Sequence, residues 1–227
     1  MRISKTALGF VGAAAAMSAG VTGSAVAAKP APNQNQTLTI TASPNPVVYS
    51  RTAVLAGRLS GSANAGVNVT LQSNPYPFTG FKPAATVTTD STGHYAFTVR
   101  PGLNTRYRAS AATKPGPNTT STEVLEQVRT RVTFGLSTYH PRRGQVVRFS
   151  GSVYPAHDGG LVAIQRRLST GAYSTITRVR LAHVIGANRS SYSKRLRVYR
   201  TGTFRVVLGS HADHARGVSS TRTARVG

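Results

Sequence analysis

Hydrophobic and polar residues alternate in short segments along the chain from residue 37 onward. The clearest segments are "TLTIT" (37–41), "VNVTLQ" (67–72), "YAFTV" (95–99), "VVRFSGSV" (146–153) and "TFRVVL" (203–208). Clusters of Gly, Pro, Asn and Ser separate them, and beyond the N-terminus no window keeps a helical apolar stripe. One strand about every ten residues, over roughly 95 residues, is typical of a sandwich of two sheets. The pattern therefore predicts an all-β chain.

The two halves of the chain align with each other. The segment "SRTAVLAGRL" (50–59) matches "GQVVRFSGSV" (144–153), which places Gly57 over Gly151. Further along, "YAFTVRPGLNTRYRA" (95–109) runs without a gap against "YSKRLRVYRTGTFRV" (192–206), and Gln72 aligns with Gln165. An internal duplication of this period indicates tandem domains. We predict one sandwich over residues 37–128 and a second over residues 129–227.

This organisation resembles the tandem immunoglobulin-like domains of secreted actinobacterial proteins. The resemblance is carried by Gly57, "GVNVTL" (66–71), "TTDSTGHYAFTV" (88–99) and "NTRYRA" (104–109), and the first copy is also similar to carboxypeptidase-regulatory-like or transthyretin-like sandwiches. The second copy departs from the pattern, with "AHVIGANRSS" (182–191) in place of the turn at 90–93. The resemblance implies two tandem immunoglobulin-like β-sandwiches in an accessory or adhesive protein, and it names no ligand.

The N-terminus has the features of an export signal. Arg2 and Lys5 precede the apolar run "ALGFVGAAAAM", and "SAVAA" ends just before Lys29. A basic start, a short apolar middle and small residues at the end predict a signal peptide over residues 1–28, followed by a linker over 29–36. The alternative is an uncleaved N-terminal anchor. We expect a secreted or cell-surface protein with no transmembrane segment in the mature chain.

Positive charge is concentrated in the second half of the chain. Residues 29–128 contain eight Lys and Arg against three acidic residues, whereas residues 129–227 contain eighteen against two. Such an excess favours polyanionic partners: cell-wall polymers, anionic lipid or nucleic acid. A coding bias toward Arg is the alternative explanation. Export makes an anionic cell-wall polymer or polysaccharide the expected partner and nucleic acid a secondary one.

Strand alternation in the second copy points to a basic sheet face. It places an apolar set inward: Val147, Phe149, Tyr192, Leu196, Val198, Phe204 and Val206. The same alternation directs five arginines outward: Arg148, Arg178, Arg180, Arg195 and Arg197. If their strands are neighbours in one sheet, the five guanidinium groups share a face and suit phosphate or carboxylate oxygens. The alternative is an ordinary solvated surface.

The segment "NPYPFTGFKP" (74–83) gathers three aromatic residues and three prolines. It follows the strand at 67–72, so we expect a stiff connection in which Phe78 and Phe81 cover the open edge of the core. The other interpretation is a stacking platform for a ligand. Tyr76 is the aromatic residue that we expect to be exposed, and we include it among the candidate ligand-binding residues.

Catalytic and metal-binding signatures are weak. The chain has no cysteine, which excludes thiol catalysis and Cys-ligated zinc. "DSTG" (90–93) has one carboxylate and fits a turn rather than a calcium loop. "HADH" (211–214), together with "HD" (157–158), is the only metal-like group, and its spacing matches no standard signature. We predict no catalytic residue, no metal and no cofactor. The expected function is that of a non-enzymatic binding module. A structural or adhesive spacer is the alternative, and an enzyme using residues 211–214 is a third hypothesis.

Overall fold

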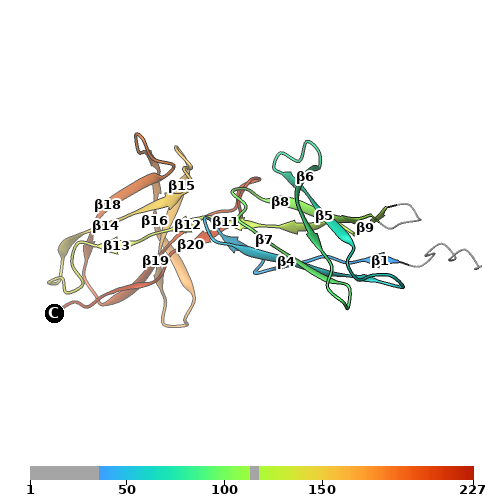
Figure 1. The fold of residues 1–227 in the computed structure, drawn as a ribbon. Helices are drawn as coiled ribbons and strands as arrows, with labels where there is room; N and C mark the ends of the chain where they lie inside the picture. Colours follow the sequence, from blue (N-terminus) through green and yellow to red (C-terminus); the bar gives the residue numbers. More distant parts are fainter. Residues whose placement is uncertain (1–35, 113–117) are drawn as a thin grey trace, which may run out of the picture. The chain divides into compact units, whose positions relative to one another are not determined.

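The computed structural model of the protein describes residues 36–112 and 118–227. Every regular element within these residues is a β-strand, and the strands form two sandwiches, one after the other along the chain (Figure 1). The prediction of an all-β chain with two tandem β-sandwiches is confirmed. The predicted signal peptide and all but the last residue of the predicted linker lie outside the described residues. Within the described part, the protein has no helix with the length and hydrophobicity that a membrane span requires.

The first sandwich consists of two antiparallel sheets. One has the order β1-β4-β2, with β7 also paired to β4, and the other has the order β10-β8-β5-β6, with β9 also paired to β8. Their strands are β1 (Thr37–Leu38), β2 (Thr41–Ser43), β4 (Ala53–Ser60), β5 (Asn68–Pro75), β6 (Lys82–Thr88), β7 (His94–Val99), β8 (Thr105–Ala111), β9 (Thr119–Thr120) and β10 (Val124–Glu126). A short parallel pair joins β3 (Val47–Val48) to β11 (Val128–Arg129), so the predicted domain boundary falls within β11.

The second sandwich has the same plan. One sheet has the order β12-β14-β18-β17, with β13 also paired to β14, and the other has the order β16-β15-β19-β20, with β21 also paired to β19. Its strands are β12 (Arg131–Val132), β13 (Gly135–Leu136), β14 (Gln145–Tyr154), β15 (Leu161–Arg167), β16 (Tyr173–Arg180), β17 (Ala182–His183), β18 (Ser190–Val198), β19 (Gly202–Leu208), β20 (Gly217–Val218) and β21 (Arg222–Ala224). The long antiparallel pair of β14 and β18 is the centre of the first of these sheets.

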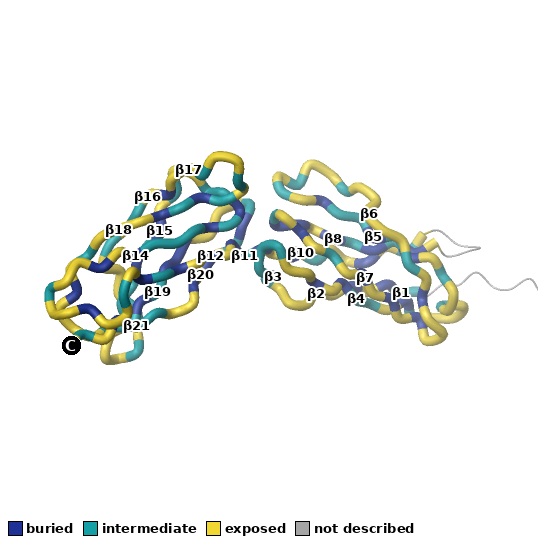
Figure 2. Tube along the Cα trace, turned by 60° about the vertical axis from the view of Figure 1, so that its left-hand side comes forward, coloured by how far each residue is buried: buried dark blue, intermediate teal, exposed yellow. Residues whose placement is uncertain are grey.

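Each sandwich buries one face of each sheet in its own core, as the alternating burial along the strands shows (Figure 2). In the second core, Phe149 is fully buried, stacked on Phe134 at 5.9 Å and edge-on to Phe204 at 5.1 Å between ring centroids. All seven residues that alternation placed inward belong to this core or pack against it. The alternation of the second copy is therefore confirmed.

Both copies share the same hydrogen bond at the position where their sequences align best. A tyrosine in each copy donates its hydroxyl proton to a threonine carbonyl in the first part of its domain: Tyr95 to Thr39 and Tyr192 to Thr133. A Cβ atom on Gly57 or Gly151 would lie 1.9 Å or 2.0 Å from that same carbonyl oxygen. Burial raises the pKa of Tyr95 to about 12 and that of Tyr192 above its usual value, so both hydroxyls stay protonated donors. The alignment of Gly57 with Gly151 thus has a steric cause.

Candidate functional site

Three of the five candidate arginines lie together on the outer face of β14 and β18. In the antiparallel register Arg148 is directly opposite Arg195, and Val146 is opposite Arg197. The intervening pair, Val147 and Leu196, points to the core. Because side chains alternate along a strand, the three arginines share one face, and all three are exposed. We call these three residues the β14–β18 face.

The facing pair surrounds a shallow depression. Ser137, Val146, Arg148 and Arg195 line a hollow of about 220 Å³. Ser137 is held against β14, because its Oγ accepts a hydrogen bond from the Arg148 backbone N–H at 3.0 Å and its N–H donates to the Arg148 carbonyl at 3.0 Å. Every ion pair between described residues is made elsewhere, by His94, Arg106, His183 and His214. The two arginines therefore lie opposite each other on paired strands without an acidic partner among the described residues. Like charges directly opposite each other are unfavourable until an anion joins them.

Arg178 and Arg180 do not belong to this face, so the prediction of five arginines on one face is wrong. Both lie on β16, which pairs with β15 in the opposite sheet. The reason is the tight connection before β16: the Leu168 N–H donates to the Ala172 carbonyl at 2.7 Å, which folds β16 back as a hairpin. Arg178 is opposite Ala163 in that register, one residue away from the buried Val162 and Ile164, so it points to the outer face of the second sheet.

A groove at the open edge of the sandwich extends the basic surface. It has a volume of about 390 Å³, and its floor includes Phe149 and Phe204 from the core. Its walls combine arginines with apolar side chains: Arg166, Arg197, Arg200, Ile176, Leu196 and Tyr199. Arg197 belongs both to the groove and to the β14–β18 face. Sequence analysis missed the groove because it forms between β16 and β18, which belong to different sheets. The exposed apolar side chains of Ile176 and Tyr199, at 46% and 56%, were the available signal.

The aromatic segment at 74–83 does not cover the first core. Phe78 lies under the guanidinium of Arg106, at 4.7 Å from the ring centroid, and Phe81 lies under Arg108 at 4.2 Å. Both arginines alternate with buried residues of β8, so these contacts are on the outside of the sheet. Tyr76 is half-buried and packs edge-on against Phe78 at 5.7 Å. The expected core plug is therefore wrong, and a ligand role for Tyr76 stays a prediction.

One of these aromatic contacts recurs in the second sandwich. Arg205 lies over the ring of Tyr173 at 3.7 Å, as Arg108 lies over Phe81. Each of these arginines also donates from Nε to an aligned glutamine: Arg108 to Gln72 at 2.6 Å and Arg205 to Gln165 at 2.9 Å. Because both copies keep it, the Gln–Arg–aromatic contact belongs to the scaffold.

Two groups in the second copy combine histidine with aspartate. Asp158 accepts hydrogen bonds from Ser190 and His183, which hold the pKa of its carboxyl below the usual value. His157, Asp213 and His214 form the other group, from segments more than 50 residues apart in sequence. The sequence singled out both segments, "HD" and "HADH", but the adjacency of His157 to Asp213 and His214 depends on the fold.

Comparisons with known proteins find matches among solved structures. The scan against protein-family models and the search of curated proteins find no match. Among solved structures, the chain is similar to one described as "Crystal structure of tetra-tandem repeat in extending region of large adhesion protein", with 17% sequence identity and a TM-score of 0.37. The match covers 85% of this chain and 50% of that one. The chain thus spans about half the length of the matched structure.

Proposed function

We propose that the chain is an exported, non-enzymatic tandem of immunoglobulin-like sandwiches that binds an anionic cell-wall polymer through the β14–β18 face. The observation that carries the proposal is the cross-strand pair of Arg148 and Arg195 around a depression, without an acidic partner among the described residues. A phosphate or carboxylate group between the two guanidinium forks replaces their repulsion with charge-assisted hydrogen bonds.

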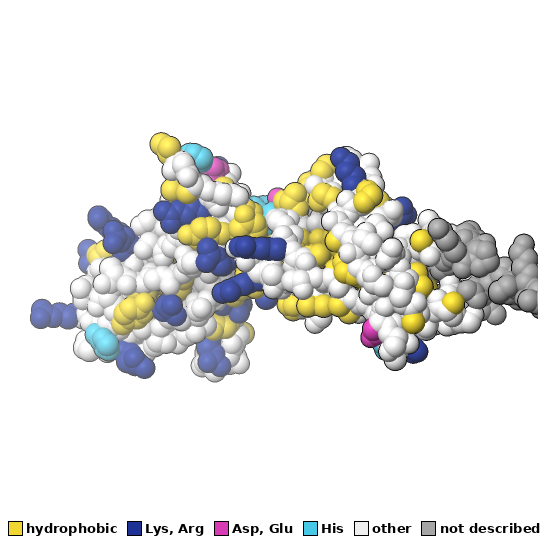
Figure 3. All heavy atoms as spheres, viewed as in Figure 1, with side chains coloured by type: hydrophobic (Ala, Val, Ile, Leu, Met, Phe, Trp, Pro, Cys, Tyr) yellow, Lys and Arg dark blue, Asp and Glu magenta, His cyan; other side chains and the backbone are white. Residues whose placement is uncertain are grey.

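The surface around this pair suits a polymer better than a small isolated anion. Arg197 continues the β14–β18 face and leads into the edge groove, where Arg166 and Arg200 add further charge. The repeated anionic groups of one polymer molecule can contact several of these arginines at once. On the side of the molecule visible in Figure 3, Lys and Arg side chains gather over the second sandwich and are sparse over the first. We therefore expect the second sandwich to carry the binding.

A pair of matched variants tests this proposal. Replacing Arg148 and Arg195 by Gln removes two charges from the face, whereas replacing Arg178 and Arg180 by Gln removes two charges from the opposite sheet. Binding of the full-length chain to a purified teichoic-type polymer is measured at several salt concentrations. We expect the Arg148/Arg195 variant to bind at least about tenfold more weakly, with a shallower salt dependence, because fewer counterions are released on binding.

The Arg178/Arg180 variant is the control for net charge. We expect it to lose less affinity than the Arg148/Arg195 variant at every salt concentration. Equal losses in both variants would mean that the polymer responds to net charge and not to the β14–β18 face. No binding of the unmodified chain at physiological salt would leave the structural or adhesive spacer as the function.

A further inference from the structure

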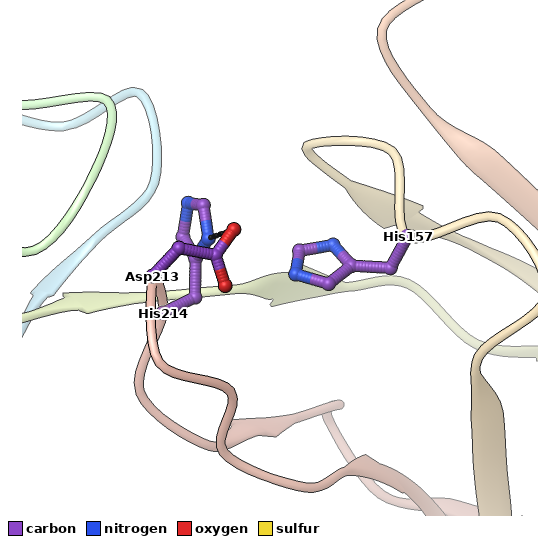
Figure 4. Close-up of side chains that lie close together, drawn as sticks. All are labelled: His157, Asp213 and His214. Carbon is purple, nitrogen blue, oxygen red and sulfur yellow. Dashed lines mark ion pairs between the residues drawn. The ribbon is translucent and has the colours of Figure 1, made fainter. Parts of the chain in front are cut away.

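Two loops of the second sandwich bring three metal-ligating side chains together. His157 lies in the connection between β14 and β15, whereas Asp213 and His214 lie in the connection between β19 and β20. One donor atom from each of the three side chains lies within 4.8 Å of the others. The close-up shows the ring of His157 and the carboxylate of Asp213 directed toward each other, with His214 beside the carboxylate (Figure 4).

Hydrogen bonds to backbone carbonyls fix which ring nitrogens are free. Nδ1 of His157 is 3.0 Å from the Pro155 carbonyl oxygen, and Nε2 of His214 is 2.8 Å from the Gly102 carbonyl oxygen. A carbonyl only accepts, so each of these nitrogens carries the proton. In the neutral rings the lone pairs therefore sit on Nε2 of His157 and on Nδ1 of His214. Metal-binding histidines are typically oriented by this kind of second hydrogen bond.

Both lone-pair nitrogens are buried and lack a hydrogen-bond partner among the described residues. His214 as a residue is only 1% exposed, so solvent does not reach it. Its Nδ1 is 3.0 Å from Oδ2 of Asp213, close enough for an ion pair when the ring is charged. Such a pair still leaves Nε2 of His157 buried without a hydrogen-bond partner, which is unfavourable. One ligand bound to all three side chains satisfies both histidines.

The loop that carries Asp213 is held in place before any ligand binds. The backbone N–H of Asn104 donates to the Asp213 carbonyl at 2.9 Å, and its side-chain amide donates to the Ala212 carbonyl at 3.1 Å. Asn104 is itself buried. The position of the Asp213 backbone is therefore fixed by the fold.

We propose that His157 Nε2, His214 Nδ1 and a carboxylate oxygen of Asp213 bind a divalent transition-metal ion, with zinc as the best fit. Two imidazole nitrogens and one carboxylate are a typical zinc ligand set, whereas calcium and magnesium prefer oxygen ligands. Zinc bonds of about 2.0–2.2 Å place tetrahedral ligand atoms about 3.3–3.6 Å apart, so the donor atoms draw together by roughly 1 Å on binding.

The fourth coordination position has a nearby candidate within the same loop. The exposed ring of His211 lies 5.1 Å from the ring of His157, between centroids. It either completes the site or leaves the position to water. In both cases the ion joins the 155–160 connection to the 211–214 segment. This inference is independent of the binding to an anionic polymer, because none of its residues belongs to the β14–β18 face.

Zinc chloride and the full-length chain, prepared without a histidine tag, are sufficient for the test. Isothermal titration calorimetry gives stoichiometry and affinity, and thermal unfolding gives the shift in Tm. We expect one zinc ion per chain and a Tm that rises with zinc concentration and returns on addition of EDTA. His157→Gln and Asp213→Asn should each weaken binding at least about tenfold, the lower end of the loss seen when even an outer partner of a metal ligand is removed.

His94→Gln is the matched control, since His94 is an exposed histidine close to one carboxylate, Asp90, at 3.9 Å. This variant should bind zinc as the unmodified chain does. Asp213→Asn keeps the shape of the side chain, so it decides the outcome if His157→Gln fails to fold. Cobalt(II) provides a second readout, because a four-coordinate site gives an intense visible absorption that Asp213→Asn should abolish. Absence of saturable one-to-one binding, or binding unchanged in both variants, would overturn the proposal.

Discussion

Glu126 is a carboxylic acid in the interior of the first sandwich, and its burial predicts an unusual dependence of stability on pH. The residue is 0% exposed. Its Oε1 accepts a hydrogen bond from the Val47 backbone N–H at 3.0 Å, while Oε2 has no hydrogen-bond partner among the described residues. Burial raises the pKa from its ordinary 4.5 to about 7, although the hydrogen bond from Val47 lowers it in part. The folded state therefore favours the neutral acid.

The direction and size of the effect follow from this difference in pKa. Between the unfolded value of 4.5 and the folded value of about 7, the folded state binds the extra proton. The stabilisation that this proton provides is fully present below pH 4.5, falls as the pH rises toward 7, and is absent above it. At about 1.4 kcal/mol per pKa unit, the free energy of unfolding should fall by about 3 kcal/mol across this window.

Glu126→Gln isolates this contribution, because glutamine keeps an oxygen that accepts from Val47 and cannot ionise. Urea unfolding of the full-length chain is followed between about pH 5 and pH 8 for both proteins. The two free energies should agree within about 1 kcal/mol at pH 5, and the variant should be more stable by about 2–3 kcal/mol at pH 8. Glu123→Gln, which changes an exposed acid in the same stretch, is the control and should not alter the pH dependence in this window. Parallel curves for unmodified chain and Glu126→Gln would refute the argument.

Two further predictions concern the scaffold and its maturation. In urea unfolding, Gly151→Ala should lower the free energy of unfolding by about 1–3 kcal/mol or more, because its Cβ would meet the Thr133 carbonyl oxygen at 2.0 Å. Gly209→Ala is the control and should be nearly neutral, because the space around its Cβ position is open. Mass spectrometry of the exported protein should give an N-terminus at Ala28 or Lys29, and an intact Met1 in a membrane fraction would identify the N-terminal stretch as an anchor.

The sequence predicted the core of the second sandwich because alternation with a period of two is a local property. Val147, Phe149 and Val206 are inward-facing in any sheet that their strands join, so their burial did not depend on the topology. The match of Gly57 to Gly151 was equally informative, since it reflects a backbone contact that excludes any side chain. These features needed no knowledge of which strands are neighbours.

The composition of the basic face depended on topology and was predicted only in part. Alternation correctly directed Arg178 outward, but the period of a strand does not tell which sheet it joins. A five-residue connection, closed by the hydrogen bond from Leu168 to Ala172, makes β16 pair with β15 in the opposite sheet. Arg148 and Arg195 were grouped correctly because their strands, β14 and β18, are neighbours.

The sequence singled out both segments of the proposed metal site, but it could not predict that they lie together. Standard zinc signatures place ligands at fixed short spacings, and here His157 is separated from Asp213 by more than 50 residues. The two loops meet because β15 begins beside the end of β19. Val162 is opposite Leu208 in their antiparallel register, so the connection before β15 and the connection after β19 lie at the same end of the sheet. The fixed ring tautomers depend on carbonyls of Pro155 and Gly102, which no residue pattern specifies.

Comparison of the two copies separates the scaffold from the chemistry proposed for the second. The aligned counterpart of the Arg148–Arg195 pair is Val54 opposite Thr98, in the same antiparallel register between β4 and β7. The first copy therefore maintains this pair of strands without charge at either position. Its counterparts of the histidine loops, residues 60–68 and 112–118, contain neither histidine nor acid. The scaffold requires neither feature, so replacing Arg148 and Arg195 by uncharged residues, or Asp213 by Asn, should leave the fold intact. A loss of binding in these variants then reports on the side chain that was removed.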